Sequence, residues 1–142
     1  MAILHIAAHV VASSGEASIA LGYGEGWTPR EIAANDVWRW RVRPPLVTLN
    51  GCGSGAGAIL PGTGRLGLTR AWLMAGARDV VATYWPTPDD SSEMFRVFYG
   101  ALRRDPHLSP ARALRQAQIA MIHSPTRRAL PAFWAAYYMT GI

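Results

Sequence analysis

Cys52 and His9 are the two side chains of this sequence best suited to do chemistry together. Cys52 is the single cysteine, and it lies in LVTLNGCGSGAG (46–57), where an apolar run leads into closely spaced glycines. Gly51 and Gly53 flank the thiol and allow a tight turn that would present it beyond a strand. A thiolate attacks a carbonyl carbon when a nearby histidine acts as its base. His9 follows another apolar run and is the candidate base.

These two residues meet only if their strands are neighbours in a parallel sheet. Short apolar runs with small or polar residues at their ends predict strands at 2–7, 18–21, 46–50, 79–84 and 134–140. Apolar spacing and capping residues predict helices at 28–34, 65–76, 90–103 and 109–122. Alternating strands and helices predict an α/β fold with a mostly parallel sheet and helices on both faces.

Several single residues refine this outline. Thr28 and Pro29 suit the start of a short helix, Gly76 suits the end of one, and Ser109 suits an N-cap. In such a fold, ligands and chemistry lie beyond the carboxyl ends of the strands, where His9 and Cys52 are expected. His5 lies deeper in the first strand, and we expect it to be a hydrogen-bonded core side chain.

The glycine loop also has a second interpretation, as a cofactor cradle. Residues 51–56 satisfy G-x-G-x-x-G/A, and NGCGSG resembles the loop of methyltransferases that bind S-adenosylmethionine. That chemistry requires a helix directly after the loop and an acidic residue about 20 positions later. Here the glycines and proline of 61–64 delay any helix, and no acidic residue occurs between Asp36 and Asp79. The nucleophile is therefore the favoured interpretation, and we expect no cofactor.

Composition limits the other classes of function. The 142 residues suit one domain, half of them are hydrophobic, and the net charge of +5 comes from scattered arginines without any lysine. This charge indicates a solvated surface more than a nucleic-acid partner. Apolar runs are too short to span a membrane, no metal-ligand spacing occurs, and no secretion signal is recognisable. We expect a cytoplasmic protein with no metal, no nucleic acid and no membrane partner.

The order of several motifs adds a family resemblance. The segments HIAAH, GWTPREIA, PPLVTLNGCGSG, GRLGLTRAWLMAGARDVVATYWPTPDD and SPARALRQAQIAM lie at 5–9, 26–33, 44–55, 64–90 and 109–121. Together they resemble the CHAT domain, a caspase-like cysteine protease domain that often lies beside tetratricopeptide repeats and is related to separase, gingipains and caspases. The resemblance implies one domain, 1–142, with a caspase-like three-layer sandwich. Family members have strands before the histidine strand, so we expect this chain to be the catalytic C-terminal part of a longer protein.

The resemblance also implies roles for individual residues. His9 would be the general base or proton donor, and Cys52 the nucleophile that forms a thioacyl intermediate. The oxyanion would be met by the backbone N–H groups of Cys52 and Val10. Family members usually have glycine after the histidine, and the β-branched Val10 resists positive φ. Asp89, with Asp90 as second choice, matches the aspartate of a W-x-x-x-D segment in separase that recognises a basic side chain.

These roles predict a cysteine endopeptidase that cleaves protein substrates after a basic residue, with arginine favoured. Asp89 and Asp90 equally suit the start of a helix, where negative charge is stabilised. A tetratricopeptide-repeat or other regulatory domain is the expected partner besides the protein substrate. The alternative from another class is a catalytically inactive CHAT-like module that binds partners, which Val10 favours. The methyltransferase is the third and least favoured candidate.

Overall fold

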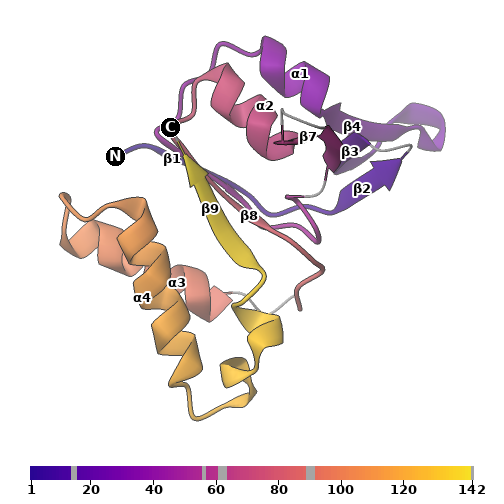
Figure 1. Ribbon diagram of the computed structural model, residues 1–142. Helices are drawn as coiled ribbons and strands as arrows, with labels where there is room; N and C mark the ends of the chain where they lie inside the picture. The colour runs from indigo at the N-terminus through magenta and orange to yellow at the C-terminus, as the bar shows by residue number, and fades with distance from the viewer. Residues whose placement is uncertain (14–15, 56, 61–63, 89–91, 142) are drawn as a thin grey trace.

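The fold is built on a four-stranded sheet that carries two helices on each face (Figure 1). The computed structural model describes residues 1–13, 16–55, 57–60, 64–88 and 92–141. The sheet has the order β1 (Ile3–Ile6), β5 (Leu46–Leu49), β8 (Asp79–Thr83) and β9 (Tyr137–Gly141). The first three strands are parallel, and β9 runs antiparallel to β8. The predicted α/β fold with a mostly parallel sheet is confirmed.

The helices complete two hydrophobic cores, one on each face of this sheet. The helices are α1 (Ala34–Arg39) and α2 (Leu68–Ala75) on one face, and α3 (Ser92–Arg104) and α4 (Pro110–Ile122) on the other. Strand alternation divides β8 between them: Val80 and Ala82 join the α1/α2 core, and Val81 joins the α3/α4 core. This arrangement is the three-layer sandwich expected from the sequence.

Two predicted helix ends are confirmed by their capping geometry. Gly76 ends α2 in the left-handed conformation at φ 108°, and its N–H donates to the carbonyl of Leu73. The side chain of Ser109 accepts a hydrogen bond from the N–H of Arg112 at the start of α4. These local signals are independent of the tertiary fold, which explains why the sequence was sufficient to find them.

The predicted helix 28–34 was wrong, and so were the first three residues of the predicted helix 65–76, because both segments are strands. Residues Pro29–Ala33 form β4, which pairs with β3 (Glu16–Tyr23); β3 also pairs with β2 (Val10–Ser13) in an antiparallel sheet. Residues Gly64–Gly67 form β7, paired with β6 (Gly57–Leu60), and α2 begins only at Leu68. Pairing across the ladder outweighed the local helix signals, because propensity is only a weak prior.

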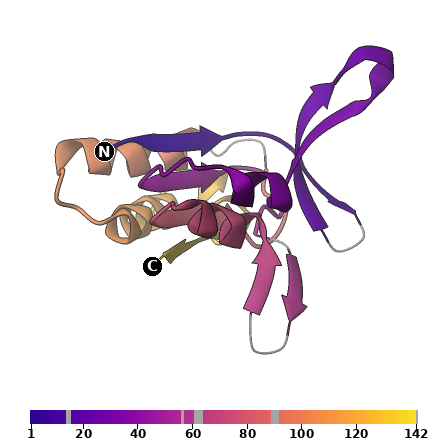
Figure 2. The same ribbon diagram turned by 90° about the horizontal axis from the view of Figure 1, so that it is seen from above.

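Both additional β units extend from the same end of the central sheet. Figure 2 shows β2, β3 and β4 in indigo and violet, and β6 and β7 in pink, projecting from the end where β1 and β5 finish. A short 3-10 helix, η1 (Glu25–Trp27), lies between β3 and β4. Trp27 at this tip is 82% exposed and stands next to Tyr23. The carboxyl end of the sheet, where the candidate site was expected, is therefore flanked by two projecting β units.

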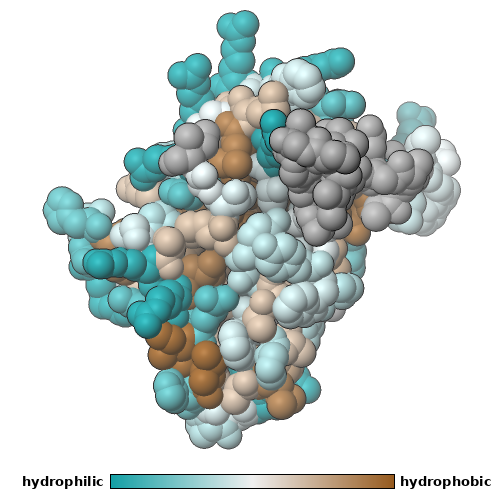
Figure 3. All heavy atoms as spheres, viewed as in Figure 1, coloured by the Kyte–Doolittle hydropathy of each residue, from teal (hydrophilic) through white to brown (hydrophobic). Residues whose placement is uncertain are grey.

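In the part of the chain that the structure describes, none of the helices is long and apolar enough to cross a bilayer. On the face shown in Figure 3, hydrophobic residues are interspersed with hydrophilic ones. Two 3-10 helices, η2 (Arg127–Ala129) and η3 (Pro131–Phe133), connect α4 to β9.

Candidate active site at the ends of β1 and β5

His9 and Cys52 line the same pocket because their strands are parallel neighbours. The register pairs Ile6 with Leu49, and the N–H of Asn50 donates to the carbonyl of Ile6 at 2.8 Å, which extends the pairing beyond both strands. The pocket beyond this point has a volume of about 260 Å³. It is lined by Ala7, Ala8, His9, Asn50, Gly51, Cys52, Thr87 and Pro88. The two residues that the sequence singled out therefore face one cavity.

Gly51 allows this close approach of the two chain segments. A Cβ atom at position 51 would lie 2.3 Å from the carbonyl oxygen of Ala8 and 2.9 Å from a methyl group of Val10. The backbone before Cys52 therefore packs directly on the backbone before His9, with no room for a side chain. The glycine predicted from sequence to permit a turn serves instead to bring two segments into contact.

A buried hydrogen-bond network fixes the loop that carries Cys52. The hydroxyl of Thr83, at the end of β8, donates to the carbonyl of Gly51 at 2.7 Å. The hydroxyl of Ser54 donates to the carbonyl of Leu49 at 2.8 Å and accepts from the N–H of Thr83 at 3.0 Å. Both side chains are fully buried, so these bonds are shielded from water. The loop is tied to its own strand and to the next one.

Sequence reasoning missed two residues that complete the pocket. The thiol of Cys52 donates to the carbonyl of Thr87 at 3.7 Å. Asn50 accepts a hydrogen bond from the hydroxyl of the buried Tyr137 at 2.7 Å, which orients its side chain beside the pocket. The position of Asn50 directly before the glycine loop was the available signal for its role. Thr87 acts through its backbone, so its residue type carried no signal.

His9 is exposed and is positioned mainly by its backbone. Its carbonyl accepts from the N–H of Ala20 in β3 at 2.8 Å. Because hydrogen-bonded and non-hydrogen-bonded pairs alternate in an antiparallel ladder, the next pair, Val10 with Ile19, directs the N–H of Val10 away from β3. Val10 lies in extended β2 and has no positive φ, so its backbone needs no glycine here.

Comparison with known proteins identifies the family. A family model described as "CHAT domain" matches residues 1–142. The chain belongs to the CHAT domain family. It is 32% identical to Tetratricopeptide repeat protein 28 of Homo sapiens over 111 residues, which is 78% of this chain. It is 31% identical to the protein of the same name from Mus musculus over the same share. The matched region spans 4% of each of these relatives.

His5 of this CHAT domain differs from its prediction in one respect. Its Nδ1 atom is 2.5 Å from the hydroxyl of Tyr99 on α3, and its ring makes edge contacts with Phe95 and Tyr99. The side chain is thus hydrogen-bonded as expected, but the residue is exposed at the edge formed by β1 and is not a core residue. Partial burial of the ring by α3 lowers the pKa of His5 from its usual 6.5.

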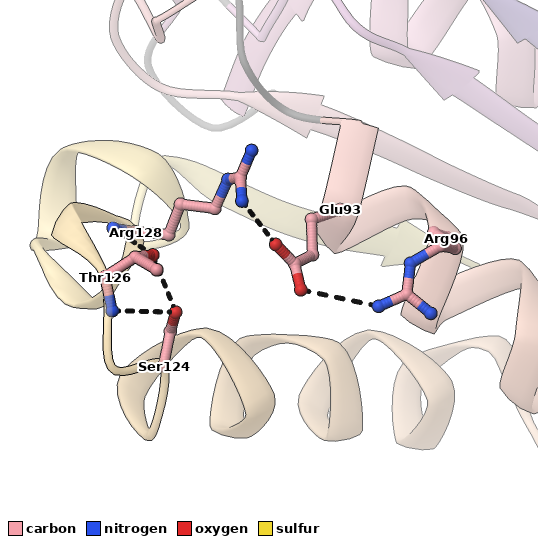
Figure 4. Close-up of polar contacts among 5 residues, drawn as sticks. All are labelled: Glu93, Arg96, Ser124, Thr126 and Arg128. Atoms are coloured by element: carbon pink, nitrogen blue, oxygen red, sulfur yellow. Dashed lines mark hydrogen bonds and ion pairs between the residues drawn. The ribbon is translucent and has the colours of Figure 1, made fainter.

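The acidic residues proposed for substrate recognition, Asp89 and Asp90, lie outside the described residues. The first described carboxylate after them belongs to Glu93 on α3. Glu93 accepts hydrogen bonds from Arg128 at 2.6 Å and Arg96 at 3.4 Å, and lies between the two arginines in Figure 4. Its negative charge is therefore used to join α3 to η2.

The loop that contains Cys52 does not have the geometry of a cofactor cradle. The N–H of Ser54 donates to the carbonyl of Gly51 at 3.1 Å, and that of Gly55 donates to the carbonyl of Thr83 at 2.8 Å. Two donors that a phosphate or nucleotide would need are thus bonded within the protein. Among the described residues, no group of three His, Cys, Asp or Glu side chains is placed to hold a metal. Among the described residues that line the pocket, the thiol of Cys52 and the imidazole of His9 are the candidate reactive groups.

Proposed function

We propose that this CHAT domain is a cysteine endopeptidase that uses a His9/Cys52 dyad. The observation that carries the proposal is the shared pocket, in which an exposed imidazole and the single thiol lie at the ends of adjacent parallel strands. A thiol alone is more often inert, and a histidine alone is more often structural. Their convergence in one cavity is what a nucleophile and its base require.

The reaction would proceed through a thioester. His9 takes the proton of Cys52, and the sulfur attacks the carbonyl carbon of the scissile peptide bond, forming a C–S bond while the C=O electrons move to oxygen. The tetrahedral oxyanion collapses, the C–N bond breaks, and the amine leaves with the proton from His9. Water then hydrolyses the thioester with His9 as base, which releases the acid and restores the thiol.

Backbone donors for the oxyanion are proposed at Cys52 and Val10. The alternation of the β2–β3 ladder supports Val10, since it leaves its N–H directed away from β3. The side chain of Val10 contacts the site of Gly51, which places residue 10 next to the nucleophile loop. A glycine at this position is therefore not essential to the proposal.

A preference for arginine before the scissile bond is proposed from Asp89 and Asp90. Both follow Pro88, which lines the pocket, and a carboxylate pairs with a guanidinium in a bidentate manner. Glu93 is a weaker candidate because two arginines already occupy its oxygens. Since the matched relatives are named for tetratricopeptide repeats, we propose such a repeat domain as the regulatory partner.

Covalent labelling tests the proposal directly. The protein is incubated with an acyloxymethyl ketone that bears arginine, and separately with one that bears leucine, and labelling is read by intact mass. We expect one adduct on Cys52 with the arginine probe and at least tenfold slower labelling with the leucine probe. Asp89→Asn and Asp90→Asn, made separately, identify the carboxylate responsible for this preference.

Matched variants distinguish the dyad from simple thiol reactivity. Cys52→Ala should abolish labelling, and His9→Ala should slow it by about 100-fold. His107→Ala serves as the control, because this exposed histidine lies between α3 and α4 and should leave the rate unchanged. Equal labelling of the wild type and His9→Ala would contradict the dyad.

A second candidate function is an inactive module that binds partners. The contact between the Cys52 thiol and the carbonyl of Thr87 favours it, because a thiol that donates to this carbonyl is not paired with His9. This candidate predicts no labelling by either ketone, while iodoacetamide modifies Cys52 at the rate of a free thiol. The same experiment therefore decides between the two.

A further inference from the structure

The segment that joins α1 to β5 presents arginine and tryptophan side chains to solvent. Residues 38–43 read WRWRVR, and five of these six residues are exposed. Trp38 is 57% exposed and Val42 is 48% exposed. The other three exposed residues are arginines: Arg39, Arg41 and Arg43. The segment lies at the amino end of β5, whereas Cys52 follows the carboxyl end of the same strand, so it is separate from the proposed active site.

Two contacts hold this segment against the rest of the domain. Trp40, the inward-facing member of the six, packs its ring edge on the buried Trp72 of α2, with 5.7 Å between the ring centroids. The stem of the Arg43 side chain lies against Gly76, where an added Cβ atom would be 2.7 Å from its Cγ atom. The backbone that carries the exposed side chains is therefore fixed before a partner binds, which lowers the ordering cost of binding.

The three arginines of this segment have no counter-ion within the described chain. Among the described residues, none of Arg39, Arg41 and Arg43 forms an ion pair or a side-chain hydrogen bond. Asp36, the acidic residue that precedes them on α1, accepts a hydrogen bond from the N–H of Ala33 at the start of the helix. Like charges on alternate residues repel one another, and an anionic partner relieves this repulsion.

Helix ends explain only part of this arrangement. Arg39 lies in the last turn of α1 and Arg43 lies beside the end of α2, where positive charge is stabilised. That effect does not account for Arg41, nor for the exposure of Trp38 and Val42. Tryptophan and arginine are enriched at the positions that dominate the binding energy of protein interfaces. The segment thus combines cations with an apolar anchor, as an interface requires.

We propose that residues 38–43 bind an acidic segment of a partner protein. Carboxylates of the partner pair with the guanidinium groups, each of which can donate two parallel hydrogen bonds to one carboxylate. An apolar side chain of the same partner segment packs on Trp38. Charge complementarity favours this occupant, because three cations lie in the segment and the whole chain has a net charge of +5. The inference does not depend on peptidase activity.

A single-stranded nucleic acid would also complement the charge, but it fits this surface less well. Its successive bases stack on several aromatic side chains. Within residues 38–43, Trp38 offers an exposed ring, whereas the ring of Trp40 is engaged with Trp72. The segment therefore matches an acidic protein segment with one apolar anchor better than it matches a series of bases.

The test measures the fluorescence anisotropy of a short fluorescein-labelled peptide of repeated Glu-Glu-Leu as the protein is added. A Gln-Gln-Leu peptide of the same length lacks the carboxylates, and a labelled single-stranded oligouridylate represents nucleic acid. We expect the acidic peptide to bind about tenfold more tightly than the glutamine peptide, because only the acidic one pairs with the arginines. Added NaCl should weaken this binding, since exposed ion pairs are screened by salt.

Variants at exposed positions locate the surface. Arg41→Gln should weaken binding of the acidic peptide about threefold, and Trp38→Ala about tenfold. Arg115→Gln, on the exposed side of α4, and Trp27→Ala, at the exposed tip of η1, are the matched controls and should leave the affinity unchanged. Thermal unfolding of each variant checks that it is folded.

Specific results would overturn the proposal. Equal affinity for the acidic and the glutamine peptide would exclude recognition of carboxylates. An equal loss of affinity in Arg41→Gln and Arg115→Gln would assign the attraction to net charge alone. Tighter binding of oligouridylate than of the acidic peptide would assign the surface to nucleic acid. If the acidic peptide binds as expected while the arginine ketone does not label Cys52, the endopeptidase proposal fails and this one stands.

Discussion

The two residues of the proposed dyad are held in opposite ways. Cys52 follows an interior strand, and buried hydroxyls of Ser54 and Thr83 fix its loop. His9 follows β1, which forms an edge of the described sheet, and its setting depends on one backbone bond from Ala20 and on exposed surroundings. The loop of Cys52 is thus held by buried side-chain bonds, whereas the segment of His9 is exposed and held through its backbone.

The largest effect is expected from a substitution that separates the segment before Cys52 from the segment before His9. Gly51→Ala forces a Cβ atom against the Ala8 carbonyl, and backbone atoms on both strands have to shift. We expect it to destabilise the protein by about 3 kcal/mol and to stop labelling by the arginine ketone. Urea unfolding measures the stability.

Gly100→Ala is the matched control for that change. Gly100 lies in α3, and the nearest atom to an added Cβ is the end of the flexible Arg104 side chain at 3.5 Å. Alanine should stabilise this helix by about 0.5–1 kcal/mol. A neutral Gly51→Ala, with ordinary labelling, would show that the two segments are not in contact as described.

A smaller effect is expected from a substitution that changes only the hydrogen bonds of the Cys52 loop. Thr83→Val preserves shape but removes the hydroxyl that serves Gly51 and Ser54, and leaves their buried backbone groups without this partner. We expect a loss of about 2 kcal/mol in unfolding free energy and a changed rate of Cys52 alkylation. Thr140→Val in β9, which is only partly buried, should change stability by less than about 0.5 kcal/mol. Equal effects of the two substitutions would show that the hydrogen bonds of Thr83 do not stabilise the Cys52 loop.

A substitution next to β1, the strand that leads to His9, should lower the free energy of unfolding by less. Tyr99→Phe removes the hydroxyl that bonds to His5 and should destabilise the protein by about 1 kcal/mol. Because Cys52 is anchored elsewhere, its alkylation rate should stay at the wild-type value. A large change in the alkylation rate would mean that β1 and the Cys52 loop are more strongly coupled than their contacts indicate.

The smallest effect is a dependence of stability on pH. Burial lowers the pKa of His5 in the folded protein, so below about pH 6.5 the unfolded chain binds more protons than the folded one. The free energy of unfolding should therefore decline as the pH falls from 7 to 5. His5→Gln should reduce this decline, measured by urea unfolding at each pH, and an unaltered decline would assign it to other groups.

Sequence was sufficient where a local signal and the final fold agree. The apolar runs that became β1, β5 and β8, and the caps at Gly76 and Ser109, depend on neighbours along the chain. The meeting of His9 and Cys52 followed from one rule about parallel strands. Their chemical roles, and those of Val10, Asp89 and Asp90, stay predictions.

Sequence was insufficient where distant partners decide the conformation. Thr28 and Pro29 form a good helix start, yet the segment pairs with β3, which places Ile32 opposite Ile19. Residues 65–67 were assigned to the start of a helix, but they pair with the strand that precedes them. A pocket lined by Arg70 of α2 and Tyr138 of β9 had no sequence signal, because the two residues come from distant parts of the chain.

The contact at Gly51 also determines which substitutions are compatible with the geometry of this site. Because main-chain atoms set the separation of the segments before His9 and Cys52, we expect exchanges of core side chains on either face of the sheet to leave it unchanged. Position 51, in contrast, has no room for another residue type, since each of them adds a Cβ atom. A transplant of this dyad to another parallel sheet should therefore begin with the glycine and only then add the thiol and the imidazole.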